Sequence, residues 1–130
     1  MLPTFLVPET EVRQNGSAEP FTIPTGASTL LVTLGITHIL EQESLDVSIY
    51  GSADGANWTA KPLLAFAQKF YCGTYQMLLD LTTRPDLKQI QVRWHLNRWG
   101  RGGLLPFFEF YVYAEDAVVP ALRAKSTSAA

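Results

Sequence analysis

The sequence predicts an all-β fold: a single-domain antiparallel β-sandwich, a jelly roll of about eight strands, with extended N- and C-terminal arms. Short β-rich segments recur between turn signals, which is typical of sandwiches and barrels. No helical periodicity persists beyond a turn or two. The segment Leu45–Trp58 shows the pattern most clearly, because an alternating strand runs into a tight polar turn and then into a tryptophan.

The bulk composition fits one globular domain. The 130 residues are 47% hydrophobic and 17% charged, which is enough to bury a core, and no tract is long enough to span a membrane. The net charge of −2 and the pI of about 5.6 argue against a general electrostatic grip on nucleic acid. Cys72 is the only cysteine, so the chain forms neither an intrachain disulfide nor a multi-cysteine zinc site.

The two ends are predicted to be arms on a sandwich that comprises residues 1–116. Residues 1–10 form an edge strand or an arm, because Pro3 and Pro8 bound an apolar segment and proline cannot donate to a central ladder. Residues 117–130 form an extended C-terminal arm. The last residues of this arm are small and polar and have nothing to hold them on their own domain, so we expect them to lie on other subunits.

The N-terminus lacks the features of a secretory signal. Met1–Val7 is too short, too broken by proline and too poor in basic residues for a signal peptide. We therefore expect cytoplasmic synthesis without a classical signal, with a place in a virion or an extracellular particle as the destination. A mature exported chain with a new start Met has the same appearance.

The first strands are located by turn signals and alternation. Phe21 and Ile23 form a short strand after the turn Gln14–Ala18, and Ser28–Leu40 is the longest β-rich segment. Gly35 in the middle of that segment indicates a bulge or a close backbone approach. Further strands are expected at Leu45–Tyr50, Pro62–Phe70 (short and irregular), Tyr75–Leu81, Gln89–Trp99 and Pro106–Ala114.

Alternation also selects the core. Successive side chains of a strand point to opposite faces, so the apolar set of each amphipathic strand is expected to face inward. In Tyr75–Leu81 the facing is ambiguous, because Leu78 breaks the alternation. The residues expected in the core are Val47, Ile49, Trp58, Val92, Trp94, Phe108 and Phe110.

Several motifs follow one another in a familiar order: a strand ending in S-x-D-G-x-x-W, a middle strand, a strand of the I-x-V-R type and a closing aromatic strand. They are Ser52–Trp58, Tyr75–Leu81, Ile90–Arg93 and Phe107–Tyr113. This order resembles the discoidin-like (coagulation factor 5/8 type C, galactose-binding-like) jelly roll and is similar to small β-sandwich proteins of phage virions and tails. The resemblance implies sugar or lipid binding by loops at one end of the sandwich. The disulfide frequent in that family is absent, because Cys72 is alone.

The polar turn after Tyr50 has a calcium-like composition. Asp54 and Asn57 offer oxygen ligands, but two such residues fall far short of the roughly six to eight oxygens that calcium takes. We therefore interpret the segment as a plain hairpin turn, with no metal and no cofactor.

The basic-aromatic cluster of the chain consists of Arg93, His95, Arg98, Trp99 and Arg101. Its first interpretation is an outward strand face that contacts a neighbouring subunit, because Trp and Arg are enriched at interface anchors. The alternatives are a sugar stacked on Trp99, a phosphate held by the arginines, and a merely solvated face.

A second candidate interface is aromatic. Tyr50, His95, Tyr111 and Tyr113 have outward parity, and on neighbouring strands they make a face too large to leave in water. A subunit contact is the simplest cover for such a face. In the alternative, two of these residues lie on different sheets and never meet.

Catalytic motifs are lacking in the sequence. No G-x-S-x-G nucleophile elbow surrounds any serine, and no phosphate-cradling glycine loop opens a helix. The sequence therefore predicts a non-enzymatic structural subunit that assembles with itself, and with other particle subunits, into a phage-like particle, tube or filament. The alternative is a discoidin-like carbohydrate-binding module with a glycan partner near Arg98, Trp99 and Arg101. An enzymatic role requires a polar cluster that only the folded chain reveals.

Overall fold

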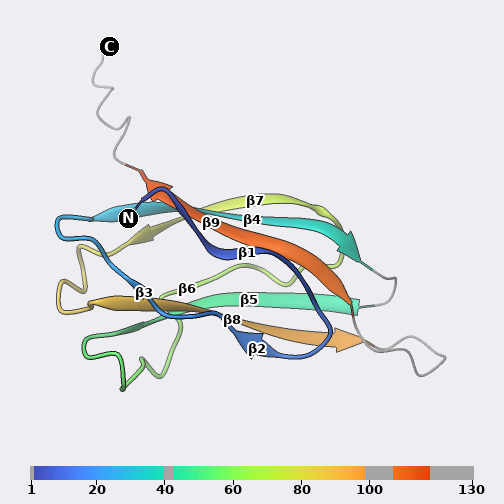
Figure 1. Cartoon of the computed structure of the whole chain (residues 1–130), viewed down its shortest axis with the longest axis horizontal. Coiled ribbons are helices and arrows are strands. Elements are labelled where there is room, and N and C mark those ends of the chain that lie inside the picture. The colour runs from blue at the N-terminus through green and yellow to red at the C-terminus, as the bar shows by residue number, and fades with distance from the viewer. Residues whose placement is uncertain (1, 40–42, 99–106, 118–130) are drawn as a thin grey trace, which may run out of the picture.

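The computed structural model describes residues 2–39, 43–98 and 107–117 (Figure 1). The regular elements in these ranges are all β-strands, so the all-β prediction is confirmed. The strands are β1 (Thr4–Val12), β2 (Gly16–Ser17), β3 (Phe21–Thr22), β4 (Thr29–Ile39), β5 (Glu43–Ser52), β6 (Leu64–Ala65), β7 (Gly73–Asp80), β8 (Gln89–Arg98) and β9 (Phe108–Asp116).

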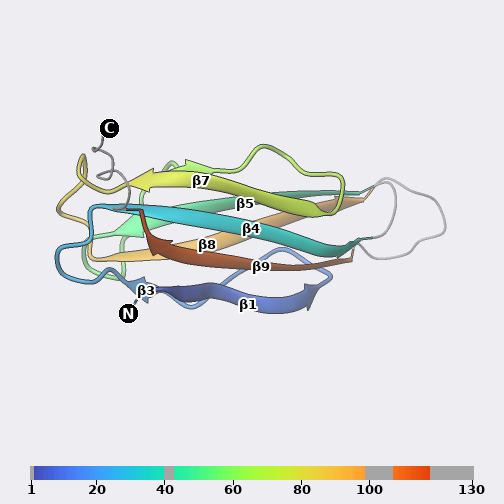
Figure 2. The same ribbon diagram turned by 90° about the horizontal axis from the view of Figure 1, so that it is seen from above.

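The strands form two antiparallel sheets that pack face to face as a sandwich (Figures 1 and 2). We call the four-stranded sheet, with the order β1-β9-β4-β7, sheet A. We call the five-stranded sheet sheet B; its order is β2-β8-β5-β6, and β3 also pairs with β8. Figure 2 shows the strands of sheet A side by side, with β7 at one edge and β1 at the other.

The strand pairings are nested along the chain. β1 pairs with β9, β2 and β3 pair with β8, β4 pairs with β7, and β5 pairs with β6. If β2 and β3 are taken as two pieces of one interrupted strand, the first strand pairs with the last, the second with the last but one, and so on inward. A long antiparallel hairpin rolled up in this way is a jelly roll, as the sequence predicts.

The core lies between the two sheets and follows the alternation of the long strands. On β5 and β9 every second residue is fully buried, which leaves polar or aromatic residues on the outer faces. The buried side chains include five of the expected core residues, namely Val47, Ile49, Val92, Phe108 and Phe110.

The two tryptophans expected in the core are not fully buried there, unlike those five residues. Trp94 is only partly buried and packs against the core from the flank of the sandwich. Trp58 does not belong to the core, and this corrects the expectation from sequence. It follows the turn after β5, bridges back to Ser52, and places its ring near the Arg93 guanidinium on the outer face of sheet B.

Both edges of sheet A are free of a second neighbouring strand among the described residues. The N-terminal segment is the edge strand β1, which is one of the two forms expected from its prolines; its pairing with β9 shifts register twice. At the other edge β7 pairs with β4 without a register shift. Leu79 of β7 faces the core and Leu78 faces outward, which resolves the ambiguous facing of this strand.

Candidate functional site

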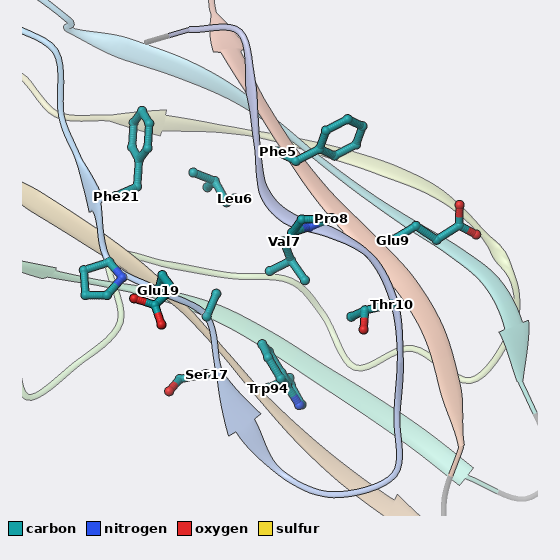
Figure 3. A pocket seen from close by; sticks show the side chains of 12 residues that line it. Phe5, Leu6, Val7, Pro8, Glu9, Thr10, Ser17, Glu19, Phe21 and Trp94 are labelled. Atoms are coloured by element: carbon teal, nitrogen blue, oxygen red, sulfur yellow. The ribbon is translucent and has the colours of Figure 1, made fainter.

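An open groove runs along one flank of the sandwich, between β1 of sheet A and β2–β3 of sheet B (Figure 3). Its volume is about 570 Å³, within the range of sites that bind small ligands. Leu6, Val7 and Trp94 form its apolar floor. The remaining lining residues are Phe5, Pro8, Glu9, Thr10, Ser17, Ala18, Glu19, Pro20 and Phe21.

Trp94 is held in this floor by contacts from several segments. Its Nε1 donates a hydrogen bond to the carbonyl of Gln14 at 3.1 Å, and its ring meets Phe110 edge to face at 5.6 Å. A Cβ on Gly16 would lie 2.9 Å from the ring, so glycine is needed where β2 crosses it. The indole is therefore a fixed part of the groove.

The charged residues that line the groove are Glu9 and Glu19. Figure 3 shows the Glu19 side chain on the β2–β3 side of the groove and the Glu9 side chain turned outward from β1. The Glu9 Oε2 accepts a hydrogen bond from the Thr37 hydroxyl at 2.8 Å, which holds this carboxylate over the outer face of sheet A. The groove is thus apolar at its floor, and Glu19 supplies a carboxylate at its β2–β3 rim.

Phe5, Tyr111 and Tyr113 gather on the outer face of sheet A, and we call these three residues the aromatic face. Phe5 meets Tyr113 edge to face at 4.9 Å and Tyr111 at 5.9 Å. A hollow of about 450 Å³ opens over them and is also lined by Glu9 and Thr33. Phe5 is 52% exposed although it is a large apolar residue.

The Tyr111 ring lies against the backbone of Gly35, its partner on β4. A Cβ built on Gly35 would approach the ring atoms of Tyr111 to 2.2 Å. The close approach expected at this glycine is therefore made by a tyrosine side chain, while the bulge lies further along, between Ile36 and His38.

Sheet A is acidic as well as aromatic. None of its strands, Thr4–Val12, Thr29–Ile39, Gly73–Asp80 and Phe108–Asp116, contains Lys or Arg. Its one basic group is His38, whose Nδ1 lies 2.8 Å from the Glu109 carboxylate. A partner for this face must therefore tolerate or neutralise carboxylates.

The outer face of sheet B carries a different cluster. The Arg93 guanidinium lies 4.3 Å from the centroid of the Tyr50 ring and 5.7 Å from that of Trp58. Its Nε donates to Gln91 at 3.1 Å, so the cation is already engaged within the chain. Such cation–π contacts stabilise the pair when the partners are desolvated.

The structure separates the residues expected to form one aromatic face. Tyr50 and His95 lie on sheet B, while Tyr111 and Tyr113 lie on sheet A, so they cover opposite sides of the sandwich. The single face is therefore not formed, and the alternative holds in which these residues lie on different sheets. Parity along a strand does not say which sheet the strand joins.

The basic-aromatic cluster is likewise brought together only in part. Arg93 and His95 both point outward from β8, and the His95 Nδ1 lies 4.0 Å from Asp46. Arg98 is the last residue of β8, and Trp99 and Arg101 lie outside the described residues, as does the C-terminal arm after Ala117. Sequence reasoning missed Phe5 as a functional candidate, although an aromatic residue at outward parity on a proline-marked edge strand was a usable signal.

The turn Ser52–Trp58 is closed by its own side chains. Asp54 Oδ1 accepts from the backbone N–H groups of Ala56 and Asn57, both at 2.8 Å, and Oδ2 accepts from the Asn57 amide at 2.8 Å. These bonds hold the pKa of Asp54 well below its ordinary value, and the bond from the Asn57 backbone N–H has the largest effect. Both carboxylate oxygens are thus occupied within the turn, in line with a hairpin.

The described ranges contain no group of three or more His, Cys, Asp or Glu side chains placed to hold a metal ion. Within the same ranges no helix has the length and apolar character needed to cross a bilayer.

Fold and site together define a jelly-roll β-sandwich with an aromatic, acidic outer face and an open flank groove. No model of a known protein family, no curated protein and no solved structure matches the chain. What the chain shares with discoidin-like domains is thus the sandwich of two antiparallel sheets, and no family match identifies such a domain.

Proposed function

We propose that the protein is a non-enzymatic structural subunit that assembles with copies of itself, as in the particles, tubes or filaments of phage-like virions and tails. The observation that carries the proposal is the aromatic face on sheet A. Contiguous apolar surface of this kind on a soluble chain marks an interaction site. The jelly roll supports the same role, because it is the fold of many capsid subunits and supplies a rigid body for repeated contacts.

The chemistry of the aromatic face suits a protein partner. Aromatic residues are the commonest energetic anchors of interfaces, and Phe5, Tyr111 and Tyr113 already contact one another, so little ordering cost remains on binding. Carboxylates at the margin, such as Glu9 and Glu115, favour a partner surface with cations. Another copy offers such cations on its exposed loops, for example Lys88.

The test is the mass of the full chain in solution, by light scattering on a sizing column at two widely separated concentrations. We expect a defined oligomer or polymer rather than the 14.4 kDa monomer. Tyr113→Ser should raise the concentration needed for assembly by about tenfold or more, as for an interface anchor. Tyr71→Ser is the matched control, because Tyr71 is 75% exposed and lies off this face.

A second candidate function, carbohydrate binding, is favoured by one specific feature. The Tyr111 ring lies close enough to Gly35 to exclude a Cβ there, and Glu9 and Thr33 line the hollow beside it. A sugar ring stacks on such an aromatic surface and hydrogen-bonds to neighbouring carboxylates and hydroxyls. A glycan array should then show a ligand whose binding is lost in Tyr111→Ala, and a chain that binds no glycan contradicts this candidate.

A further inference from the structure

The flank groove is left open by the described part of the chain. β1 pairs only with β9, and β2 and β3 pair only with β8, so neither wall has a second strand. The floor side chains Leu6, Val7 and Trp94 are held by the core on one side and face the groove on the other (Figure 3). An apolar floor between two open walls is suited to an extended peptide segment that binds through its side chains.

The chain contains one segment whose chemistry complements this groove. Residues 118–130, VVPALRAKSTSAA, begin with the apolar Val118, Val119 and Leu122 and continue with Arg123 and Lys125. The segment has no Asp or Glu, whereas the charged residues that line the groove are glutamates. Apolar residues therefore match the floor, and the cations match the rim.

The segment is also long enough to leave its own subunit. Ala117, the last described residue, donates its N–H to the Thr29 carbonyl at 3.1 Å. This bond continues the ladder between β9 and β4, and β4 lies on the side of β9 away from β1 and the groove. Thirteen extended residues span at most about 45 Å, whereas the part of β1 that lines the groove, Phe5–Thr10, extends roughly 20 Å.

We propose that the groove between β1 and β2–β3 binds residues 118–130 of a second copy of the chain. The apolar start of the segment covers Trp94 and its neighbours, and Arg123 and Lys125 lie near Glu19 at the rim. This inference rests on the proposed self-assembly and adds to it the receptor for the C-terminal arm. Repeated from copy to copy, such a head-to-tail contact builds rings or open polymers.

A charge exchange in the full-length chain tests the pairing. Glu19→Lys and Arg123→Glu should each raise the concentration needed for assembly by roughly threefold to tenfold, as expected of like charges placed together. The double variant should restore assembly. Lys61→Glu is the control for Arg123→Glu, because it makes the same charge change at an exposed residue away from the groove.

A crosslinking experiment identifies which copy supplies the segment. In a Cys72→Ser background, a Glu19→Cys chain and an Arg123→Cys chain are mixed under mild oxidation. We expect mixed disulfide dimers in excess of those formed by either chain alone, and no excess when Ala60→Cys replaces Glu19→Cys. A double-cysteine chain that closes on itself as a monomer assigns the segment to its own subunit and overturns the inference.

Failure of the inference and failure of the proposed function give different results. If the full chain assembles, but neither the charge variants nor the crosslinks behave as expected, the groove is not the receptor and self-assembly stands. If the full chain remains a monomer at every concentration and forms no mixed dimers, the proposed function and the inference both fall.

Discussion

The two edge strands of sheet A, β1 and β7, differ in how well their free backbone edges are protected against pairing with another strand. β1 contains Pro8, shifts register against β9 twice, and carries Glu9 and Glu11. β7 contains no proline, pairs with β4 without a shift, and has Asp80 as its one charged residue. Two apolar residues of β7, Met77 and Leu78, are 37% and 61% exposed.

This difference indicates how each edge is used. Proline, bulges and charges on an edge strand prevent another strand from pairing with it. The flank beside β1 therefore offers side chains rather than a backbone template, which suits a groove with a fixed floor. β7 offers a regular edge with exposed Met77 and Leu78, on which a second strand can pair by its backbone.

The largest expected effect comes from a substitution at the residue of β7 that faces the core. Leu79 is 2% exposed, so Leu79→Ala should lower the free energy of unfolding by about 2–5 kcal/mol through lost burial and a cavity. Leu78→Ala, one residue earlier and pointing outward, should change it by about 0.5 kcal/mol or less. Urea unfolding measures both variants, and equal losses would show that the facing of β7 is wrong.

A second prediction compares the outer sides of the two edges. Leu78→Lys places a charge on the unprotected edge and should slow heat-induced association, as charged residues on natural edge strands do. Pro8→Thr removes protection from β1 and should increase the association rate. Light scattering during heating measures both rates. The comparison fails if Leu78→Lys associates as fast as the parent chain.

A third prediction concerns the contact between Gly35 of β4 and the Tyr111 ring of the aromatic face. Gly35→Ala should displace the Tyr111 ring and cost about 0.5–1.5 kcal/mol, the value of an aromatic pair. In a Tyr111→Ala background the same substitution should become stabilising by about 0.5–1 kcal/mol, because alanine loses less backbone entropy than glycine. A double-mutant cycle by urea unfolding measures the reversal, and simple additivity would contradict it.

The smallest effect concerns the one charge of β7. The Thr82 hydroxyl and N–H donate to Asp80, and they lower the pKa of this carboxyl below its ordinary value. Because the pKa is lower in the folded chain, the contribution to stability is present above the unfolded pKa of about 3.9 and is lost as the pH falls through the folded value.

Asp80→Asn tests this assignment. Between neutral and acidic pH, the midpoint of urea unfolding should fall less in Asp80→Asn than in the parent chain. Thr82→Ala should reproduce part of the effect, since the hydroxyl is the larger cause of the shift and the backbone N–H remains. An identical pH dependence in parent and variant would show that this carboxyl is not linked to folding.

Much of the fold was predictable because strand alternation is a local property. The inward set of β5 follows from Val47 and Ile49, and that of β9 from Phe108 and Phe110, without knowledge of any partner strand. Trp58 was misplaced for the same reason, since it follows a turn and belongs to no alternating segment. Its ring lies 5.7 Å from the Arg93 guanidinium, which is 35 residues away along the chain.

The candidate site was far less predictable. Phe5 and Tyr113 meet because the first and last strands pair, and the groove exists because β1 and β2–β3 lie on different sheets with their edges apart. Both facts depend on which strands become neighbours, and the periodicity of a strand carries no information about its neighbours.

By itself, the sequence determined the all-β class, the positions of most long strands, the buried faces of β5 and β9 and the self-contained turn at Asp54. These features follow from side-chain alternation and from hydrogen bonds between near neighbours in the chain. The tertiary structure alone decided that Tyr50 and Tyr111 lie on opposite sides, that Trp94 lies in the floor of a groove, and that β7 is an edge strand. Each of these depends on contacts between distant segments, which form only when the two sheets close on a common core.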